Sequence, residues 1–200
     1  MRFEEGSFTS VLEKAKQEKR MVFVDCYTSW CGPCKLMLQD VFSREDVGQF
    51  MNARFVNLKL DMEKGEGPEL ARKYQVKVYP TFLILNENGE VIHRMVGGMK
   101  VEDFLQNVQD GTGEYSLYSY EKRYAGGERD SRFVYKYIET LSKAFMKERM
   151  EQVLHEYWAT LANQEKSNRE NWSLVKRFVR DPLLPEYEYL LEHKGDFEAV

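Results

Sequence analysis

The apolar run Met21-Val22-Phe23-Val24-Asp25-Cys26-Tyr27 sets the architecture of the first half of the chain. It is short enough to be a strand buried on both faces, which is typical of a sheet covered by helices. The preceding segment, from Ser7 to about Arg20, has apolar residues at helical spacing, and Ser7 can cap that helix. We therefore expect helices and strands to alternate here.

The same pattern continues to about residue 110. Helices are expected after Cys34, from an N-cap at Ser43, through Tyr74 after a break at residues 65–68, and over residues 101–108. Strands are expected at 55–60, 81–85 and 91–96, the last two joined through a turn at 86–89. The sequence thus predicts an α/β domain over residues 1–110.

A second region begins after Gly111-Thr112-Gly113. It holds no cysteine and 15 of the 27 aromatic residues. Apolar residues recur at helical spacing in four segments, 117–124, 133–145, 150–161 and 172–179. Gly126-Gly127 separates the first two, and Asp181-Pro182 is expected to end the last. Residues 114–200 are therefore expected to form an all-α domain.

The aromatic residues of this region have two interpretations. Tyrosine and phenylalanine pairs such as Tyr120 with Tyr124 and Phe133 with Tyr137 can fill a helical core. They can instead cover the first domain or form a surface that selects a protein partner. A helical repeat is a further alternative, although no pattern recurs at a fixed period. Residues 186–200 carry no stop signal, so a longer C-terminal region could begin there.

Composition excludes several classes of protein. The 200 residues carry 29 Lys and Arg against 33 Asp and Glu, without long blocks of one sign, so we expect no nucleic-acid partner. No apolar stretch approaches the roughly 18 residues that a membrane-spanning helix needs. The segment Met1-Arg2-Phe3-Glu4-Glu5 is acidic and lacks the apolar core of a signal peptide, although a leader could have been removed.

The three cysteines lie within nine positions, which is no framework of structural disulfides. Cys31 and Cys34 flank Gly32 and Pro33 at a strand-to-helix junction, where their spacing permits a reversible disulfide. Free backbone N–H groups and the helix dipole stabilise a thiolate at Cys31, which is therefore the expected exposed nucleophile. Cys34, one turn deeper, is the expected shielded resolving thiol. Pro33 suits an early helical position, and Gly32 leaves room for a partner chain.

Zinc binding and inert burial are the alternatives for this pair. A structural zinc site needs four ligands, whereas His93, His155 and His193 are scattered along the sequence. We expect no metal site. Cys26, by contrast, lies inside the apolar run and is interpreted as a small buried packing residue.

The segment Trp30-Cys31-Gly32-Pro33-Cys34-Lys35, with Asp25 before it and Tyr79-Pro80-Thr81-Phe82 after it, resembles the thioredoxin family over about residues 1–110. The resemblance implies a thioredoxin fold, with a central mixed sheet flanked by helices. Residues 37–55 are similar to the C-terminal domain of the bacterial electron transporter DsbD and to envelope thioredoxin-like proteins. This similarity implies the periplasm or cell envelope of a bacterium, with the cytoplasm as the alternative.

The resemblance also implies residue roles around the substrate. Pro80 matches the family's cis-proline, which leaves the backbone of Tyr79 free to pair with an extended substrate segment. Trp30 is expected on the substrate face, because a residue next to the nucleophile has little core to enter. Gly97 matches a glycine near the substrate groove, or alternatively serves as a turn.

Asp25 matches the family's buried acid. Its apolar surroundings should raise the carboxyl pKa, so that it could exchange a proton with Cys34; a purely structural acid is the alternative. Asn57 stands where the family has a lysine near this acid, while Lys59 faces the same side if the register holds. Tyr27 replaces a family tryptophan.

Together these features predict a thiol:disulfide oxidoreductase that reduces or exchanges disulfides in protein clients. Cys31 attacks the client, Cys34 releases it, and an upstream electron-donor protein reopens the internal disulfide. No cofactor beyond this redox-active disulfide is expected. Gly-Pro between the cysteines resembles the reducing members, which favours a reductase in cell redox homeostasis over a disulfide isomerase. The alternative is a redox-gated binding module in which the helical region carries the main interaction.

Overall fold

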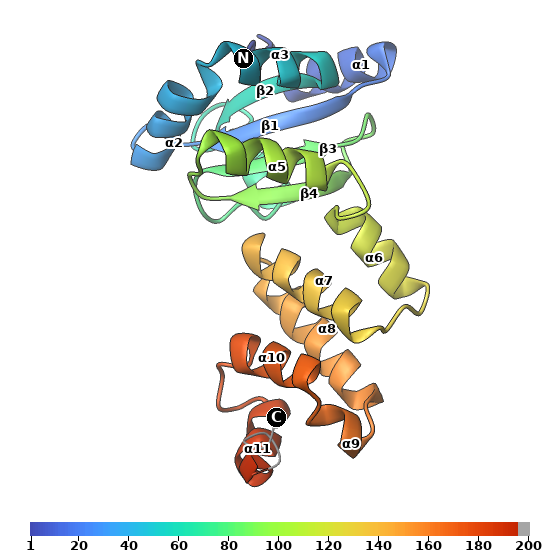
Figure 1. Ribbon diagram of the computed structural model, residues 1–200. Helices are drawn as coiled ribbons and strands as arrows, with labels where there is room; N and C mark the ends of the chain where they lie inside the picture. The colour runs from blue at the N-terminus through green and yellow to red at the C-terminus, as the bar shows by residue number, and fades with distance from the viewer. Residues whose placement is uncertain (196–200) are drawn as a thin grey trace. The chain divides into compact units, whose positions relative to one another are not determined.

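The computed structural model describes residues 1–195 and divides the chain into two compact units, Met1–Lys122 and the part from Arg123 onward (Figure 1). The last five residues of the expected helical region, at the end of the segment 186–200, lie outside the described residues.

The first unit is built on a four-stranded mixed sheet in the part of the chain that is described. The strands are β1 (Met21–Tyr27), β2 (Phe55–Asp61), β3 (Thr81–Leu85) and β4 (Val91–Val96), in the order β2-β1-β3-β4. β1 pairs parallel with β2 and antiparallel with β3, which in turn pairs antiparallel with β4. The expected strands are confirmed, and β1 lies in the interior of the sheet.

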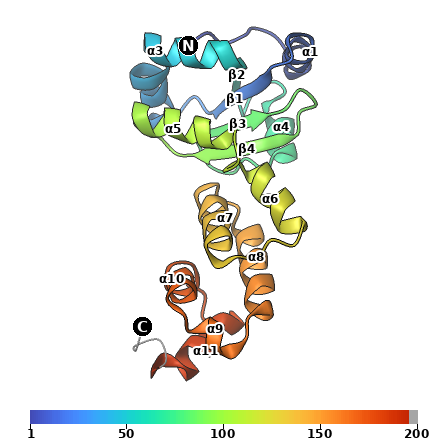
Figure 2. The same cartoon turned by 45° about the vertical axis from the view of Figure 1, so that its right-hand side comes forward.

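Helices cover both faces of this sheet (Figure 2). One face packs against α1 (Phe8–Glu18) and α4 (Gly67–Lys73). The other packs against the π-helical turn η1 (Met37–Phe42), α3 (Glu45–Arg54) and α5 (Val101–Gly111). Helix α2 (Gly32–Leu36) leads directly into η1, and this face is called the α2 face. Side chains of β1 alternate between the faces: Val24 and Cys26 point toward α1 and α4, whereas Phe23 points toward η1. By the same alternation, Asp25 lies on the α2 face.

The expected helix caps are partly confirmed. Ser7 caps α1 and accepts a hydrogen bond from the Ser10 N–H at 3.1 Å. The expected N-cap at Ser43 is wrong by one residue, because Arg44 is the N-cap of α3. The chain continues from α2 into η1, and the Ser43 hydroxyl instead donates to the Gln39 carbonyl four residues back, at 2.5 Å.

The end of the first unit is attached to the sheet through His93. This β4 side chain is buried, and its Nδ1 accepts a hydrogen bond of 3.2 Å from the N–H of Leu117, where α6 (Leu117–Ala125) begins. Burial lowers the pKa of His93 to about 4, although nearby Asp110 opposes this shift. A Cβ on Gly111 would lie 2.4 Å from the imidazole, so glycine is needed there.

The second unit is helical, as expected. Its helices are α7 (Ser131–Lys143), α8 (Lys147–Thr160), α9 (Asn163–Lys166), α10 (Arg169–Phe178) and α11 (Pro185–Glu192). Tyr124, Phe133 and Tyr137 are buried and in ring contact, so these aromatic residues do fill a core. The expected helix 133–145 ends earlier, because Phe145 has a left-handed backbone with φ of +56°. Helices α9 and α11 were not predicted.

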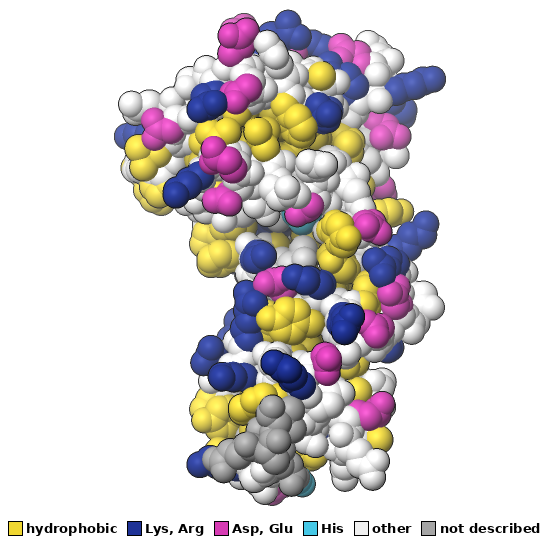
Figure 3. All heavy atoms as spheres, viewed as in Figure 1, with side chains coloured by type: hydrophobic (Ala, Val, Ile, Leu, Met, Phe, Trp, Pro, Cys, Tyr) yellow, Lys and Arg dark blue, Asp and Glu magenta, His cyan; other side chains and the backbone are white. Residues whose placement is uncertain are grey.

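Figure 3 shows acidic and basic side chains interspersed over the visible face of each unit. Within residues 1–195, no helix is both long and apolar enough to span a bilayer.

Candidate active site

The Cys-Gly-Pro-Cys segment lies where β1 gives way to α2, as the sequence predicts. Cys31 and Cys34 form a disulfide with a Cα–Cα distance of 5.3 Å. Cys31 is the N-cap of α2, and its Sγ accepts a hydrogen bond from the Cys34 N–H at 3.1 Å. The Cys31 N–H donates to the Thr28 carbonyl at 3.2 Å, and Pro33 occupies the first turn. A charge on the Cys31 sulfur would therefore meet the N-terminal end of a helix and a backbone donor.

The two cysteines do not differ in exposure as expected. In this disulfide form Cys31 is 3% exposed and Cys34 is 6% exposed, so the prediction of an exposed Cys31 beside a shielded Cys34 is wrong here. The reason is local: the Cys31 sulfur is bonded to Cys34 and also directed at the Cys34 N–H, which holds it against the helix.

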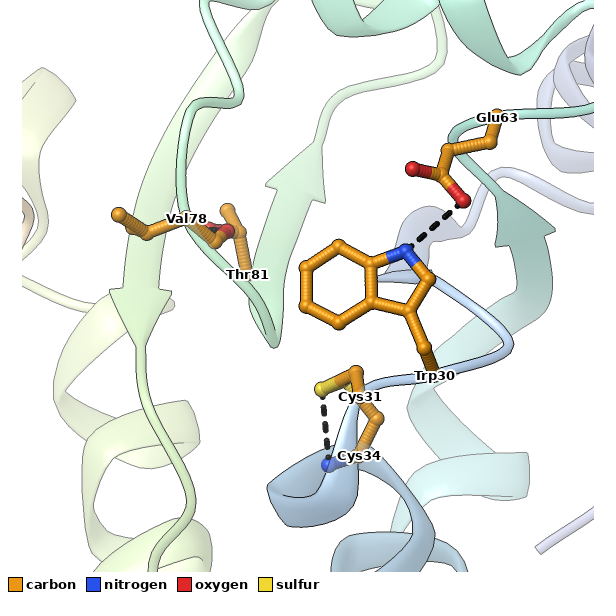
Figure 4. The surroundings of a disulfide bond; sticks show 6 residues. All are labelled: Trp30, Cys31, Cys34, Glu63, Val78 and Thr81. Atoms are coloured by element: carbon orange, nitrogen blue, oxygen red, sulfur yellow. Dashed lines mark hydrogen bonds between the residues drawn. A yellow bond between two sulfur atoms is a disulfide. The ribbon is translucent and has the colours of Figure 1, made fainter.

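Trp30 forms an aromatic border beside the disulfide. It is 64% exposed, which confirms that it stays out of the core. Its ring meets that of Tyr79 edge to face at a centroid distance of 6.0 Å. Its indole N–H donates to Glu63 Oε2 at 2.9 Å, and Figure 4 shows the indole with Glu63 on one side and Cys31 on the other.

The turn before β3 forms a second border. The Tyr79–Pro80 peptide bond is cis, as the resemblance implies. Within residues 1–195, neither backbone group of Tyr79 forms a hydrogen bond. The Pro80 carbonyl accepts from the Gly97 N–H at 2.9 Å, and Gly97 has a φ of +92°, a conformation that favours glycine. The Thr81 hydroxyl donates to the Val78 carbonyl at 2.8 Å (Figure 4) and closes the turn.

The loop after β4 also lies close to the disulfide segment, at Pro33. A Cβ built on Gly98 would lie 3.5 Å from the Pro33 Cβ, so the loop after β4 approaches the Gly-Pro pair. No atom lies within 4 Å of a Cβ built on Gly32, which leaves open space there, as expected.

Asp25 is buried at 2% exposure on the β1 strand. Burial raises the pKa of its carboxyl to about 7, and the nearby Lys59 opposes the shift. The expected register is confirmed, because Asp25 lies opposite Lys59 in the parallel pair β1–β2. Lys59 Nζ also lies 4.4 Å from the ring centre of Tyr27. Asn57 does not take the place of a cation: its amide donates to the Arg2 carbonyl at 3.1 Å.

Cys26 is a free cysteine with no exposed surface, as its interpretation as a packing residue requires. Burial and the neighbouring Asp25 raise the pKa of its thiol, so it stays protonated. Within the described residues 1–195, no cluster of three or more His, Cys, Asp or Glu side chains is arranged to hold a metal ion.

Glu63 is the residue that sequence reasoning missed. It lies in the loop after β2, and the redox loop follows β1. Because β1 and β2 are parallel, both loops leave the sheet at the same edge. The sequence feature that could have identified Glu63 is therefore its position as a polar residue just after the strand that pairs in parallel with β1.

Comparison with known proteins assigns the first unit to a protein family. Residues 8–112 match the family model described as a thioredoxin-like domain. A thioredoxin-like protein of Synechocystis is 32% identical over 51% of this chain and 91% of its own length. The chloroplastic thioredoxin Y of rice is 32% identical over 52% of this chain, and the chain spans only 56% of that relative.

One solved structure gives the same result. A candidate disulphide-isomerase from Bacteroides thetaiotaomicron is 47% identical, with a TM-score of 0.52, over 56% of this chain and 93% of that one. The C-terminal domain of DsbD from Neisseria meningitidis also matches, at 20% identity and a TM-score of 0.46, over 56% of this chain and 98% of that domain.

Proposed function

Because the chain belongs to the thioredoxin-like family of disulfide oxidoreductases over residues 8–112, we propose that it reduces disulfides in protein clients through the Cys31/Cys34 pair. The observation that carries the proposal is the disulfide at the start of α2, with the Cys34 N–H directed at the Cys31 sulfur. That donor and the helix dipole favour the thiolate of Cys31, which is the attacking form in disulfide exchange.

Reduction of a client begins from the dithiol form. The Cys31 thiolate attacks one sulfur of the client disulfide, so a Cys31–client bond forms and the client S–S bond breaks. The second client sulfur leaves as a thiolate and takes a proton. In the dithiol form the Cys31 sulfur is no longer bonded to Cys34 and is the sulfur that meets the client. The unpaired backbone of Tyr79 can then pair with an extended client segment.

Resolution needs the Cys34 thiol to lose its proton. Asp25, with a pKa of about 7, is half ionised near neutral pH and can accept a proton on the α2 face of the sheet. The Cys34 thiolate attacks the Cys31 sulfur, the Cys31–client bond breaks as the Cys31–Cys34 bond forms, and the client leaves with both of its sulfurs reduced. The client gains two electrons and this chain loses two, which an upstream dithiol donor protein must return.

Cysteine variants test this function. The assay follows reduction of a protein disulfide by the full chain, with dithiothreitol as the electron donor. Cys31→Ser should abolish turnover, because no attacking sulfur remains. Cys34→Ser should accumulate client–Cys31 mixed disulfides, because the resolving sulfur is gone. Cys26→Ser is the matched control and should turn over like the parent. Turnover of Cys31→Ser at the parent rate would refute the proposal.

For the compartment, we propose the bacterial periplasm or cell envelope. The support is the similarity of residues 37–55 to DsbD and envelope thioredoxin-like proteins. Fractionation of cells that express the complete gene product tests it, and recovery of the protein only in the cytoplasm would refute it.

A further inference from the structure

The loop after β2 places a negative charge beside the disulfide that the redox chemistry does not use. The Glu63 side chain is exposed, and its Oε2 accepts the Trp30 indole N–H at 2.9 Å (Figure 4). It also lies near the Tyr79 hydroxyl: burial raises the pKa of that group, and the charge of Glu63 adds to the rise. Glu63 therefore borders both aromatic rings that flank the Cys31–Cys34 bond.

The charges around Glu63 leave it uncompensated. The neighbouring carboxylate, Asp61, pairs with Lys64 at 3.3 Å. Lys59 lies over the Tyr27 ring and near the buried Asp25. Among residues 1–195, no Lys, Arg or His lies within ion-pairing distance of the Glu63 carboxylate. A cation that completes this site would have to come from outside the chain.

A client segment would pass close to this charge. Tyr79 offers unpaired backbone groups directly before the cis bond, and its ring contacts Trp30, which Glu63 holds. A segment paired with Tyr79 and bonded to Cys31 would thus place the residues next to its cysteine beside Trp30 and Glu63. There a Lys or Arg can meet a carboxylate and two aromatic rings, all of which attract cations.

Resting on the proposed function, we infer that Glu63 determines specificity: this oxidoreductase prefers client segments that carry a Lys or Arg next to the attacked cysteine.

The test compares disulfide peptides that differ at one position beside the attacked cysteine, which is Lys, Gln or Glu. The full chain is used in its dithiol form at stoichiometric amount, so it supplies the two electrons itself, and the second-order rate of peptide reduction is measured. One surface charge pair changes the rate by about threefold at low salt, so the Lys and Glu peptides should differ about tenfold. The difference should vanish near 1 M salt, where the screening length falls to about 3 Å.

Three variants separate charge from structure. Glu63→Gln keeps an acceptor for the Trp30 indole but removes the charge, so the preference should disappear. Glu63→Lys should invert it. Glu87→Lys is the control, because it changes the net charge by the same amount as Glu63→Lys. Glu87 lies in the turn after Leu85, and Leu85 pairs with Val22 at the end of the sheet opposite the disulfide. This variant should leave the preference intact.

The results distinguish failure of the proposed role of Glu63 from failure of the proposed function. Equal rates for the Lys and Glu peptides, or a preference that survives in Glu63→Gln, would overturn the role of Glu63 while reduction itself stands. Failure of the parent to reduce even the Gln peptide would overturn the proposed function.

Discussion

Replacing Asp25 with asparagine should stabilise the oxidised protein at neutral and alkaline pH. Asp25 is 2% exposed, and burial raises its carboxyl pKa from 3.8 to about 7. Between these two values the folded state binds more protons than the unfolded state, so stability falls as the pH rises. The difference of about three pKa units corresponds to about 4 kcal/mol at 1.36 kcal/mol per unit.

The loss of stability caused by ionisation of Asp25 should begin near pH 4 and level off above pH 7. Urea unfolding of the oxidised parent and Asp25→Asn between pH 4 and 9 measures it, and the disulfide keeps both active-site thiols from titrating. The free energies of unfolding should differ by about 4 kcal/mol more at pH 9 than at pH 4. Asp40→Asn, at an exposed position, is the matched control and should follow the parent.

A difference between Asp25→Asn and parent that does not change with pH would refute this reasoning, because the effect would then come from packing. In the dithiol form the same variant should resolve mixed disulfides more slowly, because the proton acceptor for Cys34 is lost. Unchanged resolution would leave Asp25 as a structural acid only.

Two further predictions concern packing in the first unit. The contribution of His93 to the free energy of unfolding should fall below about pH 6.5, opposite in sign to that of Asp25. The reason is that unfolded His93 gains a proton there, whereas the folded form, in which burial lowers the pKa to about 4, gains it only at lower pH. His93→Gln should remove about 3 kcal/mol of that pH dependence, and an unchanged profile in urea unfolding would contradict it. A Cβ on Gly67 would lie 1.9 Å from the Asp61 carbonyl oxygen, so Gly67→Ala should lower the midpoint of thermal unfolding by several degrees. Gly32→Ala, in open space, is its control, and equal midpoints would show that the loop relaxes freely.

The sequence predicted the sheet well because the strands have local signals. Each strand is a short apolar run with turn residues on both sides, and all four were placed within one residue. Helix ends were less certain where two signals compete. The interpretation that Asp181-Pro182 ends the helix before it is confirmed, because α10 ends at Phe178. Pro185, which starts α11, was not recognised as a start signal, and α9 is too short to show a helical period. Phe145 continued the apolar spacing of α7, but its left-handed backbone ends the helix.

The site residues also divide into those that a local sequence signal marks and those that it does not. Cys31, Cys34 and Pro80 were found because short motifs mark them, and the raised pKa of Asp25 follows from its apolar neighbours in sequence. Glu63 has no such motif, because it reaches the site only through the parallel pairing of β1 with β2. The low exposure of Cys31 depends on the disulfide itself, which closes the sulfur against α2.

The interior position of β1 also bears on how the protein is made. β1 is the first strand to be synthesised. Its hydrogen-bonding partners on either side, β2 and β3, begin only at Phe55 and Thr81. Such distant pairings form late, after much of the chain has left the ribosome. Until then, the nascent cysteines are ordinary thiols on an unfolded polypeptide, open to mispairing or to oxidation by the surroundings. Redox competence is therefore acquired by the whole unit at once, and a truncated translation product would carry the motif without its chemistry.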